Sequence, residues 1–393
     1  MKYDAKTFRL TDSGKFATVA LSIGAIGVAI SIYGWTSHAD QFFRSWLVAF
    51  GFWATISIGA LFYTLIHHVT GSVKSTNMRR ISEALGNGFP LLFILFLPVL
   101  FGLHSLYHWS HADVVAVDNI LKWKAPYLNA TFFTIRSIIY FTIWSVLGYL
   151  LYRYSTKHDE GGDPKWLNKS SKISAIGTLL FAITVTFASF DWFMSLSPHW
   201  YSTIYGVYVF GGSFLSFLTF ITLFMQWMVS RGAMTNFITI DQFHDMGRWI
   251  FGFVVFWAYI GGAQYFLIWY GNLPEETIWY LTRWENGWKD VSIIMMFFHF
   301  VIPFGILAFY YSKRNTIIRT SLAALLFVMH YVDIYWLVMP SIGHGEHAAH
   351  FSPAWMDLTT FLGVSGLVLG VFFLRFTSAA LAPLKDKNLT VYE

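Results

Sequence analysis

The segment 191–213, DWFMSLSPHWYSTIYGVYVFGGS, places a carboxylate at the end of an apolar stretch. A tight Ser-Pro-His-Trp turn and the Tyr- and Ser-containing start of the next apolar stretch follow it. A carboxylate inside hydrocarbon costs about 3 kcal/mol even on the mildest insertion scale. Membrane proteins that keep such a group commonly use it to move protons, ions or electrons. Asp191 is therefore the first candidate for chemistry.

Further ionisable groups fall deep within other apolar stretches. With a rise of about 1.5 Å per residue, His330 lies about 21 Å and Asp333 about 26 Å from the start of their stretch. Their i, i+3 spacing places both on one helical face. Polar groups at comparable depth in other stretches are Arg136, His299 and Gln264. Such groups must face a protein interior and find partners or water.

Two interpretations of this deep set stay open. In the first, carboxylates and imidazoles form a hydrogen-bonded relay that exchanges protons. In the second, Arg136 forms a fixed ion pair with one of the two aspartates, and the histidines donate to backbone carbonyls. We favour the relay for Asp191 and Asp333, and leave the role of Arg136 undecided between the two.

A second polar set lies near the other ends of these stretches, and we add its members His67, His68, His244, Asp245 and Arg248 to the candidate proton path. Simpler roles compete with this one. Asp245 and Arg248 have the spacing of a helical salt bridge, and Asp241 beside them is a natural helix cap. His67 and His68 end a helix, where the dipole stabilises a cation. The tract GHGEHAAH, with His344, Glu346, His347 and His350, has zinc-ligand spacing, but we expect it to be incidental in a solvated loop, and expect no metal site.

The composition identifies the elements that must carry these groups. The chain has 393 residues, of which 56% are hydrophobic, 20% aromatic and only 12% charged, whereas soluble domains average about 25% charged residues. Stretches of roughly 20 apolar residues can span a membrane as helices. We count ten: 15–35, 42–69, 84–109, 126–154, 172–194, 200–230, 243–271, 288–311, 316–340 and 353–376. The sequence predicts an all-α polytopic membrane protein.

The distribution of basic residues predicts the orientation. Of the 26 Lys and Arg, 19 fall on the side of the N-terminus, five fall on the opposite side, and Arg136 and Arg248 lie within spans. The positive-inside rule then places both termini in the cytoplasm. The net charge of +5 is explained by this topology and requires no nucleic-acid partner. We expect a multi-pass protein of the bacterial inner membrane.

The spans also suggest an internal organisation within one membrane domain, 1–393. Asp191 and Asp333 each precede a proline by seven residues, at equivalent ends of spans five and nine. This repeated spacing favours two four-helix bundles, spans two to five (42–194) and spans six to nine (200–340), with spans one and ten flanking them. The segment 155–171 between spans four and five is the expected hinge. With no cysteine, the chain cannot itself supply thiolate ligands to an iron–sulfur cluster or attach a c-type haem.

Two segments carry a family resemblance: 191–213, and HDMGRWIFGFVVFWAYIGGAQYFLIWYGNLPEETIWYLTRW at 244–284. They resemble the NrfD/polysulfide-reductase membrane-subunit superfamily, and within it most closely the ActF-type subunit of alternative complex III, a quinol:electron-acceptor oxidoreductase. The resemblance extends over most of the chain. It implies partners: a second NrfD-like subunit, an iron–sulfur subunit and c-type cytochrome subunits, which would hold the clusters and the haem c. It also implies a proton path in this subunit.

We therefore expect a subunit that acts as scaffold and proton path, is not catalytic alone and binds no cofactor, with quinone or lipid as possible ligands. Two alternatives remain. The first is a direct quinone-binding redox subunit in which His and Asp accept quinol protons. The second is a stand-alone proton-coupled transporter that uses Asp191 and Asp333 as coupling sites.

Overall fold

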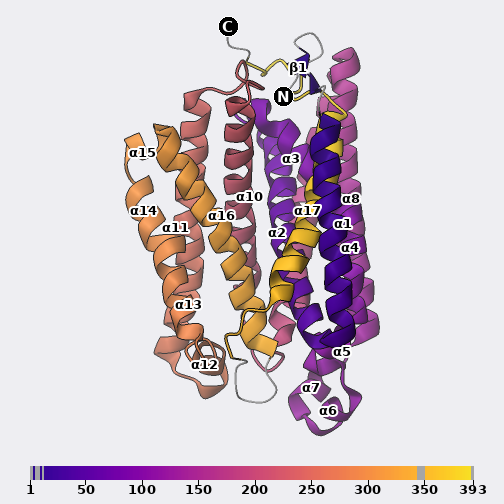
Figure 1. The fold of residues 1–393 in the computed structure, drawn as a ribbon, viewed down its shortest axis with the longest axis vertical. Coiled ribbons are helices and arrows are strands. Elements are labelled where there is room, and N and C mark those ends of the chain that lie inside the picture. Colours follow the sequence, from indigo (N-terminus) through magenta and orange to yellow (C-terminus); the bar gives the residue numbers. More distant parts are fainter. Residues whose placement is uncertain (1–2, 5–8, 11–12, 343–349, 391–393) are drawn as a thin grey trace.

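The computed structural model describes residues 3–4, 9–10, 13–342 and 350–390. These residues form an elongated helical bundle in which ten helices are long and apolar enough to cross a membrane (Figure 1). The predicted fold class, an all-α polytopic membrane protein, is confirmed. Its only strands among the described residues are the short antiparallel pair β1 (Tyr3–Asp4) and β2 (Arg9–Leu10).

Eight of the spans are built on single long helices: α1 (Ser13–Ser37), α2 (Ala39–Thr70), α8 (Ala130–Gly161), α9 (Lys165–Trp192), α10 (Tyr205–Ser230), α11 (Ile240–Gly271), α16 (Thr316–Val338) and α17 (Trp355–Thr377). The third span joins η1 (Thr76–Met78), α3 (Arg79–Gly86) and α4 (Phe89–Phe101). The eighth joins α13 (Trp288–Met295), the π-helical turn η4 (Met296–Val301) and α14 (Ile302–Leu307). The connections contain η2 (His108–Ser110), η3 (Met194–Leu196), η5 (Met339–Ile342), α5 (Leu103–Leu106), α6 (Ala112–Val117), α7 (Asn119–Lys124), α12 (Pro274–Leu281) and α15 (Tyr310–Arg314).

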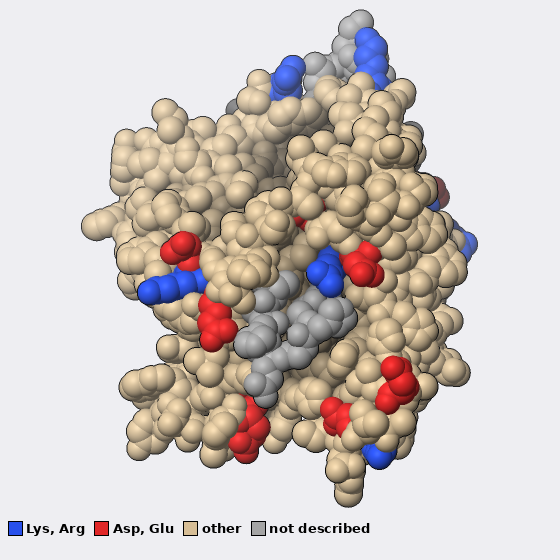
Figure 2. Space-filling model, turned by 60° about the horizontal axis from the view of Figure 1, so that its bottom comes forward, with Lys and Arg blue, Asp and Glu red and all other residues tan. Residues whose placement is uncertain are grey.

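Both chain ends lie at the same end of the bundle, which we call the terminal end (Figure 1). The opposite end, with α6, α7 and α12, is the distal end. Asp and Glu side chains are scattered over the distal end, with few Lys and Arg among them (Figure 2). The positive-inside rule predicts that the terminal end faces the cytoplasm.

Helix α2 forms the centre of the bundle, and almost all of its apolar core is buried. It packs against α3, α4, α9, α10, α16 and α17. It approaches α10 closely at Gly59, where a side-chain carbon would lie 2.3 Å from the carbonyl oxygen of Ser213. Because α2 and α10 pack directly together, the described residues form one continuous core, and the division into two four-helix bundles stays a prediction.

Several predicted boundaries differ from the structure, most of them at the third, fourth and fifth spans. The third span begins at Thr76 instead of residue 84, because Glu83 pairs with both Arg79 and Arg80 inside the bundle. The expected hinge 155–171 is wrong. Helix α8 continues to Gly161 and α9 begins at Lys165, so that only a short turn separates them. Gly162 allows this turn through its left-handed backbone, with φ of 71°.

Candidate functional site

The first deep carboxylate, Asp191, is held by a guanidinium. Arg136 on α8 donates from Nε to Asp191 Oδ2 at 2.9 Å and from Nη2 to Oδ1 at 2.8 Å. Tyr140 donates a third hydrogen bond to Oδ2 at 2.7 Å. Asp191 is fully buried, and only 7% of Arg136 is exposed. A bidentate pair of this kind fixes both side chains.

Two aromatic rings and one carbonyl complete the surroundings of Arg136. Its guanidinium carbon lies 3.8 Å from the ring centre of Tyr127 and 4.3 Å from that of Phe132. Its Nη1 donates to the carbonyl of Tyr127 at 2.9 Å. Protonating Asp191 would weaken two charge-assisted hydrogen bonds at once. The geometry at this aspartate therefore favours the fixed ion pair over the relay.

The second deep carboxylate, Asp333 on α16, has different partners. Tyr208 on α10 donates to its Oδ1 at 2.5 Å, and Trp257 on α11 donates from Nε1 to its Oδ2 at 3.2 Å. Only 2% of Asp333 is exposed. No Lys or Arg of the described part of the chain forms an ion pair with it. Asp333 can therefore bind or release a proton without breaking an ion pair.

His330 lies one turn before Asp333 and connects it to the central helix. Its Nε2 is 2.8 Å from Thr55 Oγ1 on α2, and its Nδ1 has no hydrogen-bond partner among the described residues. Gly212 on α10 faces both groups. A side-chain carbon there would lie 3.4 Å from Asp333 Oδ2 and 3.7 Å from His330 Nδ1. A side chain at Gly212 would therefore contact both the carboxyl and the imidazole.

His299 belongs to the same group through Trp257. The two rings stack with centroids 4.1 Å apart, and His299 is fully buried with no hydrogen-bond partner at either ring nitrogen among the described residues. It lies in the π-helical turn η4. Pro303 follows by four residues and lacks the N–H that would bond to the His299 carbonyl in a regular helix. Such turns are frequent at functional sites.

A cavity of about 530 Å³ opens beside this group, between α11, α12 and the eighth span. We call it the distal cavity. Its wall is mainly aromatic and includes Tyr208 and Trp257, the two residues that donate to Asp333. Gln264 also lines it, accepting a hydrogen bond from Ser202 at 2.9 Å and donating one to Tyr280 at 2.9 Å. The cavity has the size and apolar lining of a small-molecule site.

Arg283 provides a buried cation in the wall of the distal cavity. Its guanidinium carbon lies 3.4 Å from the ring centre of Trp279 and 4.8 Å from that of Trp336. It donates to two backbone carbonyls and to Ser341 Oγ, and among the described residues no carboxylate pairs with it. Burial lowers the pKa of Arg283 to about 9, so the side chain stays protonated at neutral pH. No role for Arg283 was expected from the sequence.

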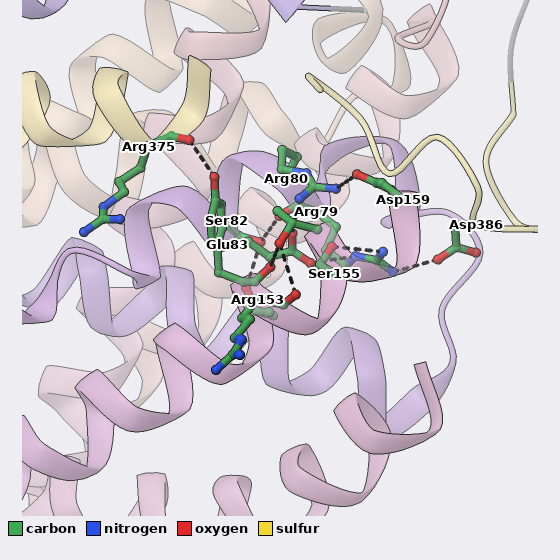
Figure 3. Close-up of polar contacts among 12 residues, drawn as sticks. Arg79, Arg80, Ser82, Glu83, Arg153, Ser155, Asp159, Arg375 and Asp386 are labelled. Carbon is green, nitrogen blue, oxygen red and sulfur yellow. Dashed lines mark hydrogen bonds and ion pairs between the residues drawn. The ribbon is translucent and has the colours of Figure 1, made fainter. Parts of the chain in front are cut away.

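The terminal end contains an ionic cluster that the sequence analysis missed (Figure 3). Arg79 pairs with Glu83 and with Asp386, each at 2.8 Å. Arg80 pairs with Asp159 and approaches Glu83 at 3.6 Å. The i, i+4 spacing of Arg79 and Glu83 was the available signal, but both had been assigned to a loop. Asp386 comes from the segment after α17, which therefore packs into the bundle.

His67 extends this cluster, and His68 follows it at the end of α2. The Nε2 of His67 is 2.8 Å from Arg79 Nη1, and its Nδ1 is 2.6 Å from Ser75 Oγ. The rings of His67 and His68 lie 5.0 Å apart. Both residues are buried, so the predicted position at the end of a helix is correct, whereas the partner Arg79 was not anticipated.

The remaining members of the second polar set lie apart from Asp333. Asp245 pairs with Lys74 at 2.8 Å and more weakly with Arg248 at 3.6 Å. His244 packs instead on the ring of Tyr310, with centroids 4.7 Å apart. Asp241 does not cap α11. Thr239 is the N-cap residue, and its backbone N–H donates to Gln242 Oε1 at 2.8 Å, whereas Asp241 pairs with Arg314 at 2.6 Å.

The candidate residues thus separate into three groups. Arg136 and Asp191 form an ion pair apart from the other candidates. The second group lies at or behind the wall of the distal cavity: Gln264 lines it, Asp333 and His299 contact its wall residue Trp257, and His330 lies one turn from Asp333. The third group lies at the terminal end: His67, His68, His244, Asp245 and Arg248. Of the GHGEHAAH tract, His344, Glu346 and His347 lie outside the described residues. Within the described part of the chain, no group of three or more His, Asp or Glu is arranged to hold a metal ion.

No protein-family model matches this chain, and no curated protein sequence matches it significantly.

Proposed function

We propose that this chain is an integral-membrane subunit of a respiratory quinol:electron-acceptor oxidoreductase of the alternative complex III type, in which it serves as scaffold and proton path. The resemblance of segments 191–213 and 244–284 supports the family. The partners would be a second NrfD-like subunit, an iron–sulfur subunit and c-type cytochrome subunits. The complex would lie in the bacterial inner membrane, with both termini of this chain in the cytoplasm.

One observation carries the proton path: Asp333 is buried, accepts two neutral hydrogen bonds and has no cationic partner in the described chain. A carboxyl in this state can alternate between protonated and ionised forms while its neighbours stay in place. Tyr208 connects it to the distal cavity, and Gly212 faces both Asp333 and His330. We assign the path to Tyr208, Asp333, His330 and Thr55. Asp191 and Arg136 act as a structural clamp outside it.

A second function, direct quinone binding, is favoured by the distal cavity. An apolar, aromatic space of about 530 Å³ fits a ring with a hydrophobic tail. Gln264, Tyr280 and Arg283 offer hydrogen-bond donors to carbonyl oxygens, and Tyr208 places Asp333 one hydrogen bond from the cavity. A quinone bound there would supply two-electron redox chemistry. The chain's own part would be to orient the ring and to receive protons at Asp333.

The stand-alone transporter is the least supported alternative, because Asp191 is committed to Arg136 and only Asp333 remains as a coupling site. Identification of the proteins that co-purify with this chain decides between a subunit of a redox complex and a stand-alone transporter. We expect the chain, purified after mild solubilisation from its native membrane, to bring subunits with iron–sulfur and haem c spectra. A chain that purifies from native membranes without any redox subunit would contradict the proposal.

A further inference from the structure

A second cleft, of about 610 Å³, lies between α2 and α11 at the terminal end. We call it the terminal cleft. Phe214, Phe253 and Phe256 line its interior, and Lys74 and Arg248 lie at its mouth. We propose that the terminal cleft binds one anionic phospholipid, with the phosphate at Lys74 and Arg248 and an acyl chain along the phenylalanines. This site is separate from the proposed proton path and does not depend on it.

The charge at the mouth matches a single phosphate. The side chain of Lys74 is 74% exposed and that of Arg248 is 65% exposed, and the two flank one carboxylate, Asp245. Two cations and one carboxylate leave one positive charge uncompensated. His67 also lines the cleft, but both of its ring nitrogens are engaged by Arg79 and Ser75. Each basic residue near a membrane surface contributes about a fivefold increase in affinity for anionic lipid.

The length of the cleft matches the chains of one leaflet. Arg248 and Phe256 are eight residues apart on α11, which corresponds to about 12 Å along the helix. One leaflet contributes about 15 Å of hydrocarbon. Gly252 lies between them in the wall, and a side-chain carbon at this position would contact nothing within 4 Å. The glycine therefore leaves the middle of the cleft open.

Other occupants fit less well. A soluble anion would use the two cations but leave the aromatic interior empty, and a neutral lipid would fill the interior without using the cations. An anionic phospholipid contacts both the cations at the mouth and the aromatic interior.

The test is native mass spectrometry of the full chain in detergent, titrated with phosphatidylglycerol and with phosphatidylcholine of the same acyl chains. We expect tighter binding of phosphatidylglycerol, by about fivefold or more. Lys74→Gln with Arg248→Gln should remove this preference. Asp245→Asn should increase it, because the carboxylate no longer competes with the phosphate. Gly252→Leu, which fills the cleft, should weaken the binding of both lipids.

Two variants control for general effects of charge and volume. Lys172→Gln removes an exposed charge at the terminal end of α9, and Gly305→Leu adds the same volume at an exposed position of α14, outside the cleft. Both should bind lipid like the unmodified chain. The proposal is overturned if the unmodified chain shows no preference for phosphatidylglycerol. It is equally overturned if the Lys74 and Arg248 variant keeps the preference, or if Asp245→Asn lowers it.

Discussion

The hydroxyl of Tyr208 lies 2.5 Å from Asp333 Oδ1, and the same tyrosine lines the distal cavity. The buried carboxyl is therefore one hydrogen bond away from a space large enough for a small molecule. Asp191, the other deep carboxylate, instead faces a guanidinium. These two aspartates share burial and depth, but only Asp333 is free of an ion pair among the described residues.

Asp191→Asn should destabilise the protein. The change leaves the buried Arg136 without its counter-charge, and breaking a buried ion pair on one side costs about 3–5 kcal/mol. The measurement is the thermal unfolding midpoint in detergent, which should fall. The double variant Asp191→Leu with Arg136→Met removes both charges and should recover part of the loss. An unchanged midpoint for Asp191→Asn would show that the pair is not structural.

Gly212→Ala should impair proton transfer while leaving the fold intact. The added methyl group would lie 3.4 Å from Asp333 Oδ2 and 3.7 Å from His330 Nδ1, which are ordinary contact distances. It would contact both groups. We expect a several-fold slower quinol-driven proton translocation in the reconstituted complex, with an unchanged unfolding midpoint. Gly305→Ala is the matched control, because its methyl group meets nothing within 4 Å. Equal rates in both variants would exclude proton transfer past this position.

Asp386→Asn should lower stability in a pH-dependent way. Burial alone would raise the pKa of Asp386, but the Arg79 guanidinium and the backbone N–H of Asn388 outweigh it, so the pKa is lowered. A carboxyl with a lowered folded-state pKa stabilises the protein above its unfolded value of about 4. That contribution disappears as the pH falls through the folded-state pKa.

The measurement for Asp386 is the difference in unfolding midpoint between the unmodified protein and the Asn variant at several pH values. The difference should be largest near pH 7 and should shrink progressively below about pH 4. A difference that stays constant with pH would mean that the ionised carboxylate does not stabilise the cluster of Figure 3.

Gly262→Leu should block the distal cavity. Gly262 lies in its wall and has no neighbour within 4 Å of a side-chain carbon, so a leucine can extend into the space. If the cavity binds quinone, the variant should bind a quinone analogue at least tenfold more weakly in a titration of the purified complex. Gly252→Leu, which fills the terminal cleft instead, should bind it normally. Equal affinity in the two variants would place any quinone site elsewhere.

The sequence predicted the membrane fold well, because ten long apolar stretches leave few alternatives. It also identified Asp191, Asp333 and their depth, since burial of polar groups in apolar helices can be counted along the chain. It could not choose which aspartate pairs with Arg136, because both lie at comparable depth and the choice depends on helix packing. The structure shows that Arg136 pairs with Asp191.

The ionic cluster at the terminal end and the two cavities could not be predicted from the sequence, because they too depend on how the helices pack. Arg79 and Asp386 are 307 residues apart and meet only because the segment after α17 packs against α3. Arg79 and Arg80 also follow a short polar stretch, so their charges appeared to belong to a loop. Cavities form where the side chains of neighbouring helices leave space unfilled, as at Gly252 and Gly262, which have no side chain.

The proton path through Asp333 is tested most directly by the number of protons translocated per electron by the complex in liposomes, compared between the unmodified protein and Asp333→Asn. We expect Asp333→Asn to lower this ratio while the subunits remain assembled. His330→Gln, one turn away on the same helix, should lower it as well. An unchanged ratio and an unchanged turnover in the assembled Asp333→Asn complex would contradict a proton path through Asp333.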